Sequence, residues 1–82
     1  MQTGSFYFFD TKGVRYYGSF EPHTLSTWRV RLEVGDTRWT VLYHPDTREA
    51  EVPNFVGTPP PLEDIARGLR AQPALKGFPD ES

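Results

Sequence analysis

The stretch that decides the fold reads Thr27-Trp28-Arg29-Val30-Arg31-Leu32-Glu33-Val34. Its even-numbered positions are apolar and its odd-numbered positions are polar, a period of two that predicts a half-buried β-strand. Gly35-Asp36 follows, and glycine can take the positive φ that the first central position of a type II′ turn requires. Residues 37–43 therefore return as the second strand of a hairpin.

A two-residue turn fixes the register of this hairpin, because it pairs Val34 with Thr37. One face of the hairpin is then apolar and is predicted to belong to the core: Trp28, Val30, Leu32, Trp39, Val41 and Tyr43. The other face is polar apart from Leu42, with Glu33 opposite Arg38 and Arg31 opposite Thr40. A sheet with one core face and one outer face is expected.

Three further strands are predicted around this hairpin. Residues 5–9 and 14–20 flank Asp10-Thr11-Lys12-Gly13, a hairpin loop with glycine at the predicted left-handed position. Pairing Phe9 with Val14 places Tyr7 and Tyr16 on one face of the first hairpin, and the opposite face then carries Phe6, Phe8, Arg15 and Tyr17. After Tyr43, a proline-containing turn over residues 44–48 leads to a short strand with Ala50 opposite Tyr43. Pro53 makes that strand an edge.

The last third of the chain predicts a connector and one helix. Residues 57–61 include three consecutive prolines, and Thr58 or one of these prolines can begin the helix. An apolar stripe follows at helical spacing: Leu62, Ile65, Ala66 and Leu69. Acidic residues lie in the first turn and Arg67 and Arg70 in the last, which suits the helix dipole. Gly68 allows close approach to the sheet, and Leu75 and Phe78 are candidates for a final contact.

The predicted organisation is a single α+β domain over residues 1–82. It consists of a five-stranded antiparallel meander sheet (4–56), a proline-rich connector (57–61), a helix packed on one face of the sheet (61–72) and a tail (73–82). A small closed β-barrel with a helical lid is the alternative architecture. The chain has 82 residues, 37% of them hydrophobic, and a domain of this size buries a limited core.

Composition excludes several classes of function. Cysteine is absent, which removes disulfides, thiolate metal sites and thiol catalysis. The formal net charge of -2 provides no strong overall field for a polyanion. No apolar run approaches the length that spans a bilayer, and the first residues lack the pattern of a signal peptide. We therefore expect a soluble, cytoplasmic protein that does not associate with a membrane.

No motif specifies a reaction or a cofactor. His23 and His44 show no catalytic spacing with serine or carboxylate residues, and no glycine-rich phosphate-binding loop occurs. His44, Asp46, Glu49 and Glu51 surround one turn, but ordinary turn chemistry and a charged edge strand explain them better than a metal does. The run Pro59-Pro60-Pro61 is interpreted as a stiff connector rather than a polyproline ligand. We expect no enzyme, no cofactor and no metal site.

One local likeness bears on nucleic-acid binding. The stretch Gly4-Ser5-Phe6-Tyr7-Phe8-Phe9-Asp10-Thr11-Lys12-Gly13-Val14-Arg15-Tyr16-Tyr17 resembles the opening hairpin of cold-shock domains. Those domains are five-stranded barrels that stack single-stranded bases on aromatic rings. Here the loop before Lys12 is one residue shorter, Val14 occupies an aromatic position and Arg15 replaces glycine. With simple pairing, Phe8 and Tyr16 lie on opposite faces unless a bulge realigns them. The resemblance ends by Phe20 and assigns no family.

The functional hypothesis is a noncatalytic interaction module, because one helix cannot cover both faces of a sheet whose first hairpin is aromatic on each. The expected assembly is a homodimer, and another protein partner is an open alternative. The predicted binding face gathers Phe6, Phe8, Arg15, Tyr17, Arg29, Arg31 and Arg38. The same residues could bind single-stranded nucleic acid, which is the second hypothesis, or could form a solvated face.

Overall fold

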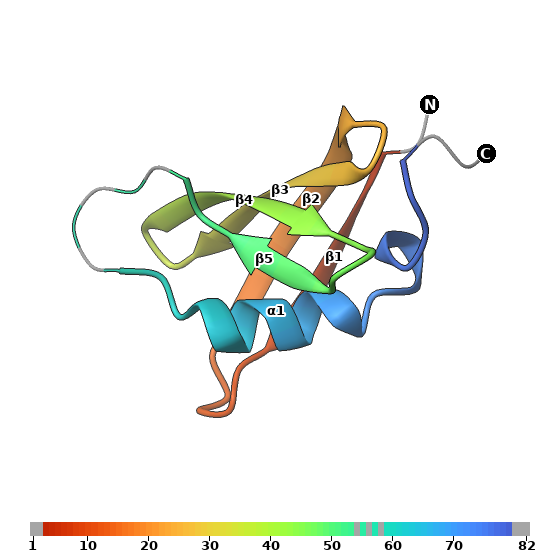
Figure 1. Ribbon diagram of the computed structural model, residues 1–82. Helices are drawn as coiled ribbons and strands as arrows, with labels where there is room; N and C mark the ends of the chain where they lie inside the picture. The colour runs from red at the N-terminus through yellow and green to blue at the C-terminus, as the bar shows by residue number, and fades with distance from the viewer. Residues whose placement is uncertain (1–2, 54, 56, 58, 80–82) are drawn as a thin grey trace.

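Five antiparallel strands form one sheet in chain order, and one helix covers a single face of it (Figure 1). The structure is a computed structural model that describes residues 3–53, 55, 57 and 59–79. Its elements are β1 (Gly4–Phe9), β2 (Arg15–Thr24), β3 (Thr27–Val34), β4 (Thr37–His44), β5 (Glu49–Glu51), α1 (Leu62–Arg70) and a 3₁₀ turn, η1 (Pro73–Leu75). The predicted α+β meander is confirmed. The sheet is not closed, so the barrel alternative is wrong.

The β3–β4 hairpin has the register that its alternation and its turn predict. Val34 pairs with Thr37, and Trp28 pairs with Tyr43 at the other end. Gly35 has φ 57, which is the left-handed value that the turn requires and that glycine adopts without a Cβ clash. The alternation of apolar and polar residues and the two-residue turn therefore specify the same register.

The β1–β2 hairpin differs from the predicted pairing by one residue. Phe9 pairs with Arg15 rather than with Val14. The backbone N–H of Gly13 donates to the carbonyl of Asp10 at 3.1 Å, and the N–H of Asp10 donates to the carbonyl of Val14 at 3.0 Å. Gly13 has φ 83. This is a turn closed by a left-handed glycine that adds a bulge residue to the returning strand.

The one-residue shift reverses the faces of β1. Phe8 lies opposite Tyr16, and their rings stack with centroids 5.0 Å apart. Both side chains are buried in the core. Phe6 and Phe8 therefore belong to the inner face, whereas the sequence pattern predicted them on the face that carries Arg15 and Tyr17. The bulge aligns the Phe8 and Tyr16 rings, but on the face that α1 covers.

The inner face of the sheet and the apolar side of α1 form the core. Ile65, Leu69 and Leu75 are completely or almost completely buried. The buried core cluster comprises Phe8, Tyr16, Trp28, Val30, Leu32, Val41, Tyr43, Ile65, Leu69 and Leu75. The indole N–H of Trp28 donates to the carbonyl of Gly77 at 2.8 Å, which fixes the segment after η1 against β3.

Three details of the core depart from the sequence interpretation. Trp39, predicted to belong to the core, is only partly buried and packs against the margin of the core. Leu62, assigned to the apolar stripe, is 41% exposed at the first turn of α1. The helix is shorter at both ends than 61–72, since Pro61 precedes its first residue and Ala71 caps its last turn. Thr58 lies outside the described residues.

The fifth strand forms where it was predicted but is short. Ala50 pairs with Tyr43, and Leu42 pairs with Glu51 at its last position. Arg48, which precedes the strand, has φ 60 and is the only described non-glycine residue with a positive φ. Its N–H donates to the carbonyl of His44 at 2.7 Å, so a tight turn joins β4 to β5.

Candidate interaction surface

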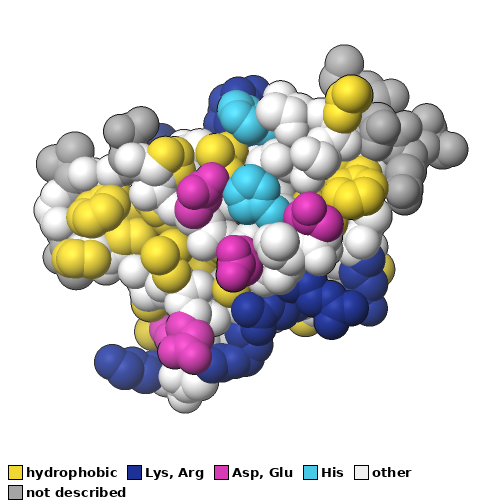
Figure 2. All heavy atoms as spheres, in the orientation of Figure 1, with side chains coloured by type: hydrophobic (Ala, Val, Ile, Leu, Met, Phe, Trp, Pro, Cys, Tyr) yellow, Lys and Arg dark blue, Asp and Glu magenta, His cyan; other side chains and the backbone are white. Residues whose placement is uncertain are grey.

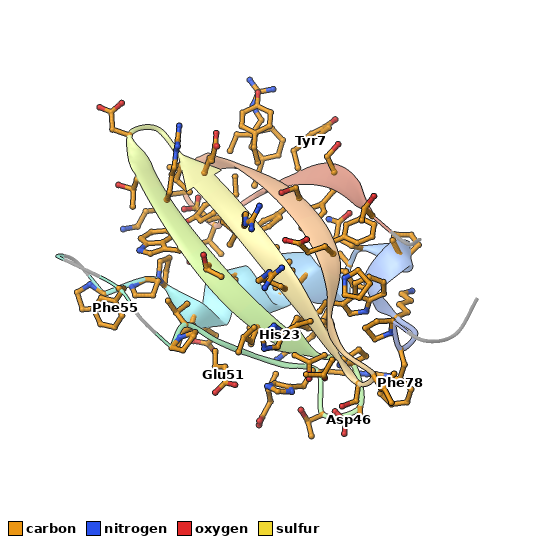
Figure 3. All side chains as sticks on the ribbon, turned by 90° about the horizontal axis from the view of Figure 1, so that it is seen from above. Tyr7, His23, Asp46, Glu51, Phe55 and Phe78 are labelled. Carbon is orange, nitrogen blue, oxygen red and sulfur yellow. The ribbon has the colours of Figure 1, made fainter. Side chains whose placement is uncertain are left out.

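Aromatic side chains remain exposed on the outer face of the first hairpin. Tyr7 and Phe9 of β1 are 59% and 57% exposed, and Tyr17 of β2 is 50% exposed. Figure 3 looks onto this face with α1 behind the sheet, and Tyr7 lies at its β1 edge. The guanidinium carbon of Arg15 lies 5.9 Å from the centre of the Phe9 ring and 5.1 Å from that of Tyr17. We call these four residues the aromatic cluster.

The Arg15 contacts order the aromatic cluster. A guanidinium over an aromatic face within about 6 Å contributes roughly 0.5–1 kcal/mol when the site is exposed. Tyr7 and Phe9 meet edge to face with ring centroids 6.1 Å apart, an arrangement that the ring quadrupoles favour. The rings are therefore held in place while much of their surface stays in water.

Arginines of β3 and β4 continue the outer face beside the cluster. Glu21 forms ion pairs with Arg29 and Arg31, with nitrogen–oxygen distances of 3.0 and 3.2 Å. Arg38 forms an ion pair with Glu33 at 3.6 Å. Solvent-accessible ion pairs of this kind typically contribute at most about 1 kcal/mol each. The side chains of Arg31 and Arg38 are 64% and 81% exposed, so both guanidinium groups remain accessible.

A shallow hollow of about 590 Å³ lies between the two tyrosines of the aromatic cluster and Arg31. Ser5 and Ser19 pair across β1 and β2, and their small side chains leave the space that the neighbouring tyrosines do not fill. Tyr7, Tyr17, Arg31 and Glu33 also line the hollow. A molecule bound in the hollow would meet aromatic rings, hydroxyl groups, one positive charge from Arg31 and one negative charge from Glu33.

The structure divides the seven predicted site residues. Arg15, Tyr17, Arg29, Arg31 and Arg38 share the outer face, as the register shows. Phe6 and Phe8 do not join them, because the bulge at Gly13 places both on the core face. Sequence reasoning missed Tyr7 and Phe9, which take their place outside. The signal that could have found them is the left-handed glycine, since a turn closed by such a glycine commonly adds a bulge residue.

Strand β1 forms a long and uncharged edge of the sheet. Among the described residues it pairs only with β2, and its own six residues include no charge and no proline. The N–H of Asp10 points toward β2. Because N–H directions alternate along a strand, those of Ser5, Tyr7 and Phe9 point away from β2. Proteins usually protect such an edge with charges, prolines or bulges.

The opposite edge, β5, has this protection. It is three residues long, two of them are glutamates, and Pro53 follows it closely. Glu51 also pairs with His44, with 3.0 Å between the carboxylate oxygen and Nε2. Within the part of the chain that the structure describes, no three His, Asp or Glu side chains lie close enough together to hold a metal ion.

Comparison with protein-family models, with curated proteins and with solved structures gave no match. Among the described residues, no helix is long and apolar enough to cross a membrane.

Proposed function

We propose that the protein is a noncatalytic interaction module that forms a homodimer through the aromatic cluster and the β1 edge. The observation that carries this proposal is three half-exposed aromatic rings beside the unprotected edge. Aromatic residues and arginine are the side chains enriched at the energetic centres of protein interfaces. Ordered rings also lose little conformational freedom when a partner covers them.

A second copy fits the β1 edge in an antiparallel register centred on Tyr7. In that register Ser5 lies opposite Phe9 of the partner subunit, so a small side chain meets a large one on the outer face. Phe6 lies opposite Phe8 of the partner subunit on the inner face, where aromatic pairs stabilise adjacent strands. The outward N–H and C=O groups of both copies become hydrogen-bonded, and the two aromatic clusters come together across the twofold axis.

The experiment changes the cluster without touching the core. Arg15→Glu together with Tyr17→Ala removes the cation and the ring from exposed positions. The dissociation constant of the dimer is expected to rise by about tenfold or more, since central aromatic and arginine residues often contribute over 1 kcal/mol each. Sedimentation equilibrium measures this constant.

Arg67→Glu is the matched control, because it makes the same charge change on α1, behind the sheet. We expect it to leave the dimer unchanged. Equal dissociation constants for the Arg15/Tyr17 variant and the wild type would contradict the role of the aromatic cluster. A similar increase in both variants would show that net charge, and not the cluster, controls association.

Binding of single-stranded nucleic acid is the second candidate, and the exposed ring faces of the same cluster favour it. Each stacked base is worth about 1–3 kcal/mol on such a platform, and Arg15 and Arg31 could reach phosphates. Glu21 and Glu33 lie between the arginines and weaken the local positive field. Titration with a labelled oligothymidylate at two salt concentrations tests this candidate. Salt-sensitive binding that Tyr17→Ala abolishes would favour it over self-association.

A further inference from the structure

A second hollow lies on the α1 side of the sheet, away from the aromatic cluster. Its volume is about 280 Å³, and its lining comes from four parts of the chain: Tyr43 at the end of β4, Pro45 and Arg48 of the following turn, Arg70 at the end of α1, and Lys76 after η1. Figure 2 shows Lys and Arg side chains in a band over α1 and the segment that follows it. We call this hollow the basic pocket.

The cations of the basic pocket have no acidic partner among the described residues. The arginines at positions 29, 31, 38 and 67 each make an ion pair, whereas no ion pair is formed there by Arg48, Arg70 or Lys76. Glu49 and Glu51 flank Ala50, whose pairing with Tyr43 places it on the inner side. Alternation along β5 therefore directs both glutamates to the outer face.

Tyr43 adds a neutral donor to the pocket. Its side chain is only 2% exposed, and its hydroxyl makes no hydrogen bond within the described part of the chain. Every fully buried side-chain nitrogen and oxygen atom there does have a partner. The Tyr43 hydroxyl therefore reaches the small accessible surface of this residue, which lines the pocket. Burial raises the pKa of Tyr43, so this hydroxyl keeps its proton, although nearby Arg70 and Arg48 act in the opposite direction.

A hydrogen bond links two of the residues that line the pocket. Arg48 has φ 60, the left-handed conformation with which it ends the tight turn that joins β4 to β5. Its carbonyl accepts a hydrogen bond from Nε of Arg70 at 3.0 Å, which ties the turn to the end of α1. The remaining guanidinium nitrogens of Arg70 are not used by this contact.

We propose that the basic pocket binds a small phosphate-type oxyanion, either inorganic phosphate or a low-molecular-weight phosphate monoester. Two guanidinium groups and one ammonium group carry three positive charges against the two negative charges of a phosphate dianion, and the Tyr43 hydroxyl supplies a further hydrogen bond. The carbonyls at the end of α1 carry a partial negative charge equivalent to about half an elementary charge. The three full positive charges of Arg48, Arg70 and Lys76 are larger than this partial negative charge. The small, partly enclosed volume favours a compact anion over an extended polymer.

The test is calorimetric titration of the intact protein with inorganic phosphate, at an ionic strength held constant with chloride. Saturable binding of one phosphate per chain is expected. Tyr43→Phe keeps the buried ring and removes only the hydroxyl, and Lys76→Gln removes one exposed charge. Each is expected to weaken phosphate binding by about tenfold, because hydrogen bonds to charged groups are the strong ones.

Two controls match these variants. Tyr16→Phe removes a hydroxyl from a different buried tyrosine of the core, and Arg67→Gln removes an exposed cation of α1 that does not line the pocket. Both are expected to bind phosphate as the wild type does. The absence of saturable binding to wild type would overturn the proposal, and so would equal losses in Lys76→Gln and Arg67→Gln. The Arg15/Tyr17 variant should retain phosphate binding, because this site is independent of the proposed dimer.

Discussion

Asp10 organises the turn that determines which face each aromatic residue of β1 occupies. One carboxylate oxygen accepts hydrogen bonds from the backbone N–H of Lys12 at 2.8 Å and of Val14 at 2.9 Å. The other accepts a hydrogen bond from the Tyr16 hydroxyl at 3.3 Å. The bond from Val14 is the main reason that the pKa of Asp10 is lowered from its ordinary value.

A lowered pKa makes the contribution of Asp10 to stability depend on pH. The folded state favours the carboxylate, so the stabilisation is present above the unfolded pKa of about 4 and is lost as the pH falls through the lower folded value. Asp10→Asn is therefore expected to be less stable than wild type at neutral pH, with the difference shrinking below about pH 4. Urea unfolding across this range measures it. A difference that stays constant with pH would contradict the role of the charge.

For Gly68, the structure predicts the direction in which an alanine substitution changes the free energy of unfolding. Alanine is normally about 1 kcal/mol better than glycine inside a helix. A Cβ at position 68, however, would overlap the Phe8 ring, and overpacking of a core costs about 1–3 kcal/mol. Gly68→Ala should therefore lower the free energy of unfolding, while Glu63→Ala on the exposed side of the same helix should change it little. A more stable Gly68→Ala protein would show that α1 does not press against Phe8.

The two tryptophans should differ in their contribution to stability. Trp28 is 1% exposed and hydrogen-bonded to Gly77, so Trp28→Ala is expected to cost about 3–5 kcal/mol. Trp39 is only partly buried, so Trp39→Ala should cost less. Thermal unfolding followed by circular dichroism compares the two. Equal losses of stability would mean that the edge of the core is as tightly packed as its centre.

At the scale of elements, β1 is the part of the sheet whose backbone matters most for the proposed dimer. The N–H of Tyr7 points away from β2, so a proline there removes no hydrogen bond of the monomer. Tyr7→Pro and Tyr7→Ala both lose the ring, but only the proline variant also loses the outward N–H. Tyr7→Pro should therefore dissociate the dimer more than Tyr7→Ala does.

Analytical ultracentrifugation of the two variants separates the edge from the aromatic cluster. Similar melting temperatures for Tyr7→Pro and Tyr7→Ala, measured at a concentration where both are monomeric, would show that the proline leaves the monomer fold intact. If the two variants then had the same dimer dissociation constant, the β1 edge would have no part in association, and the aromatic cluster alone could still be the interface.

The elements also show how far the sequence predicts this structure. The register of the β3–β4 hairpin is predictable from the sequence, because a period of two and a two-residue turn both specify it. The pairing of β1 with β2 is not, because counting loop residues misses the bulge at Gly13 that shifts the register by one. Because of that shift, the candidate site contains Tyr7 and Phe9 in place of the predicted Phe6 and Phe8. The shift moves only the residues of β1 relative to the rest of the sheet. Arg15, Tyr17 and the arginines of β3 and β4 therefore share one face whichever register β1 takes, and this face was predicted.

The basic pocket could not be predicted from sequence patterns, for a different reason. Arg48, Arg70 and Lys76 belong to a turn, a helix end and a tail, and only the packing of α1 on the sheet brings them together. The local sequence gives each of them an ordinary role: Arg70, for example, suits the end of a helix dipole. Their convergence around the Tyr43 hydroxyl is a property of the tertiary structure alone.

At the scale of the whole molecule, the two proposed sites occupy opposite sides of one sheet. The outer face and the β1 edge would hold two copies together in a continuous sheet, and the α1 side of each copy would keep its basic pocket open. This arrangement suits a chain of 82 residues, because a small domain buries a limited fraction of its surface alone and gains stability from a partner subunit.

The central claim is that the protein self-associates, and light scattering coupled to size-exclusion chromatography tests it most directly. The chain has a mass of 9.4 kDa, and the account predicts twice this mass for the wild type at micromolar concentrations. The Arg15/Tyr17 variant should shift toward the mass of one chain under the same conditions. A wild-type protein that keeps the mass of a single chain up to millimolar concentrations would contradict the account.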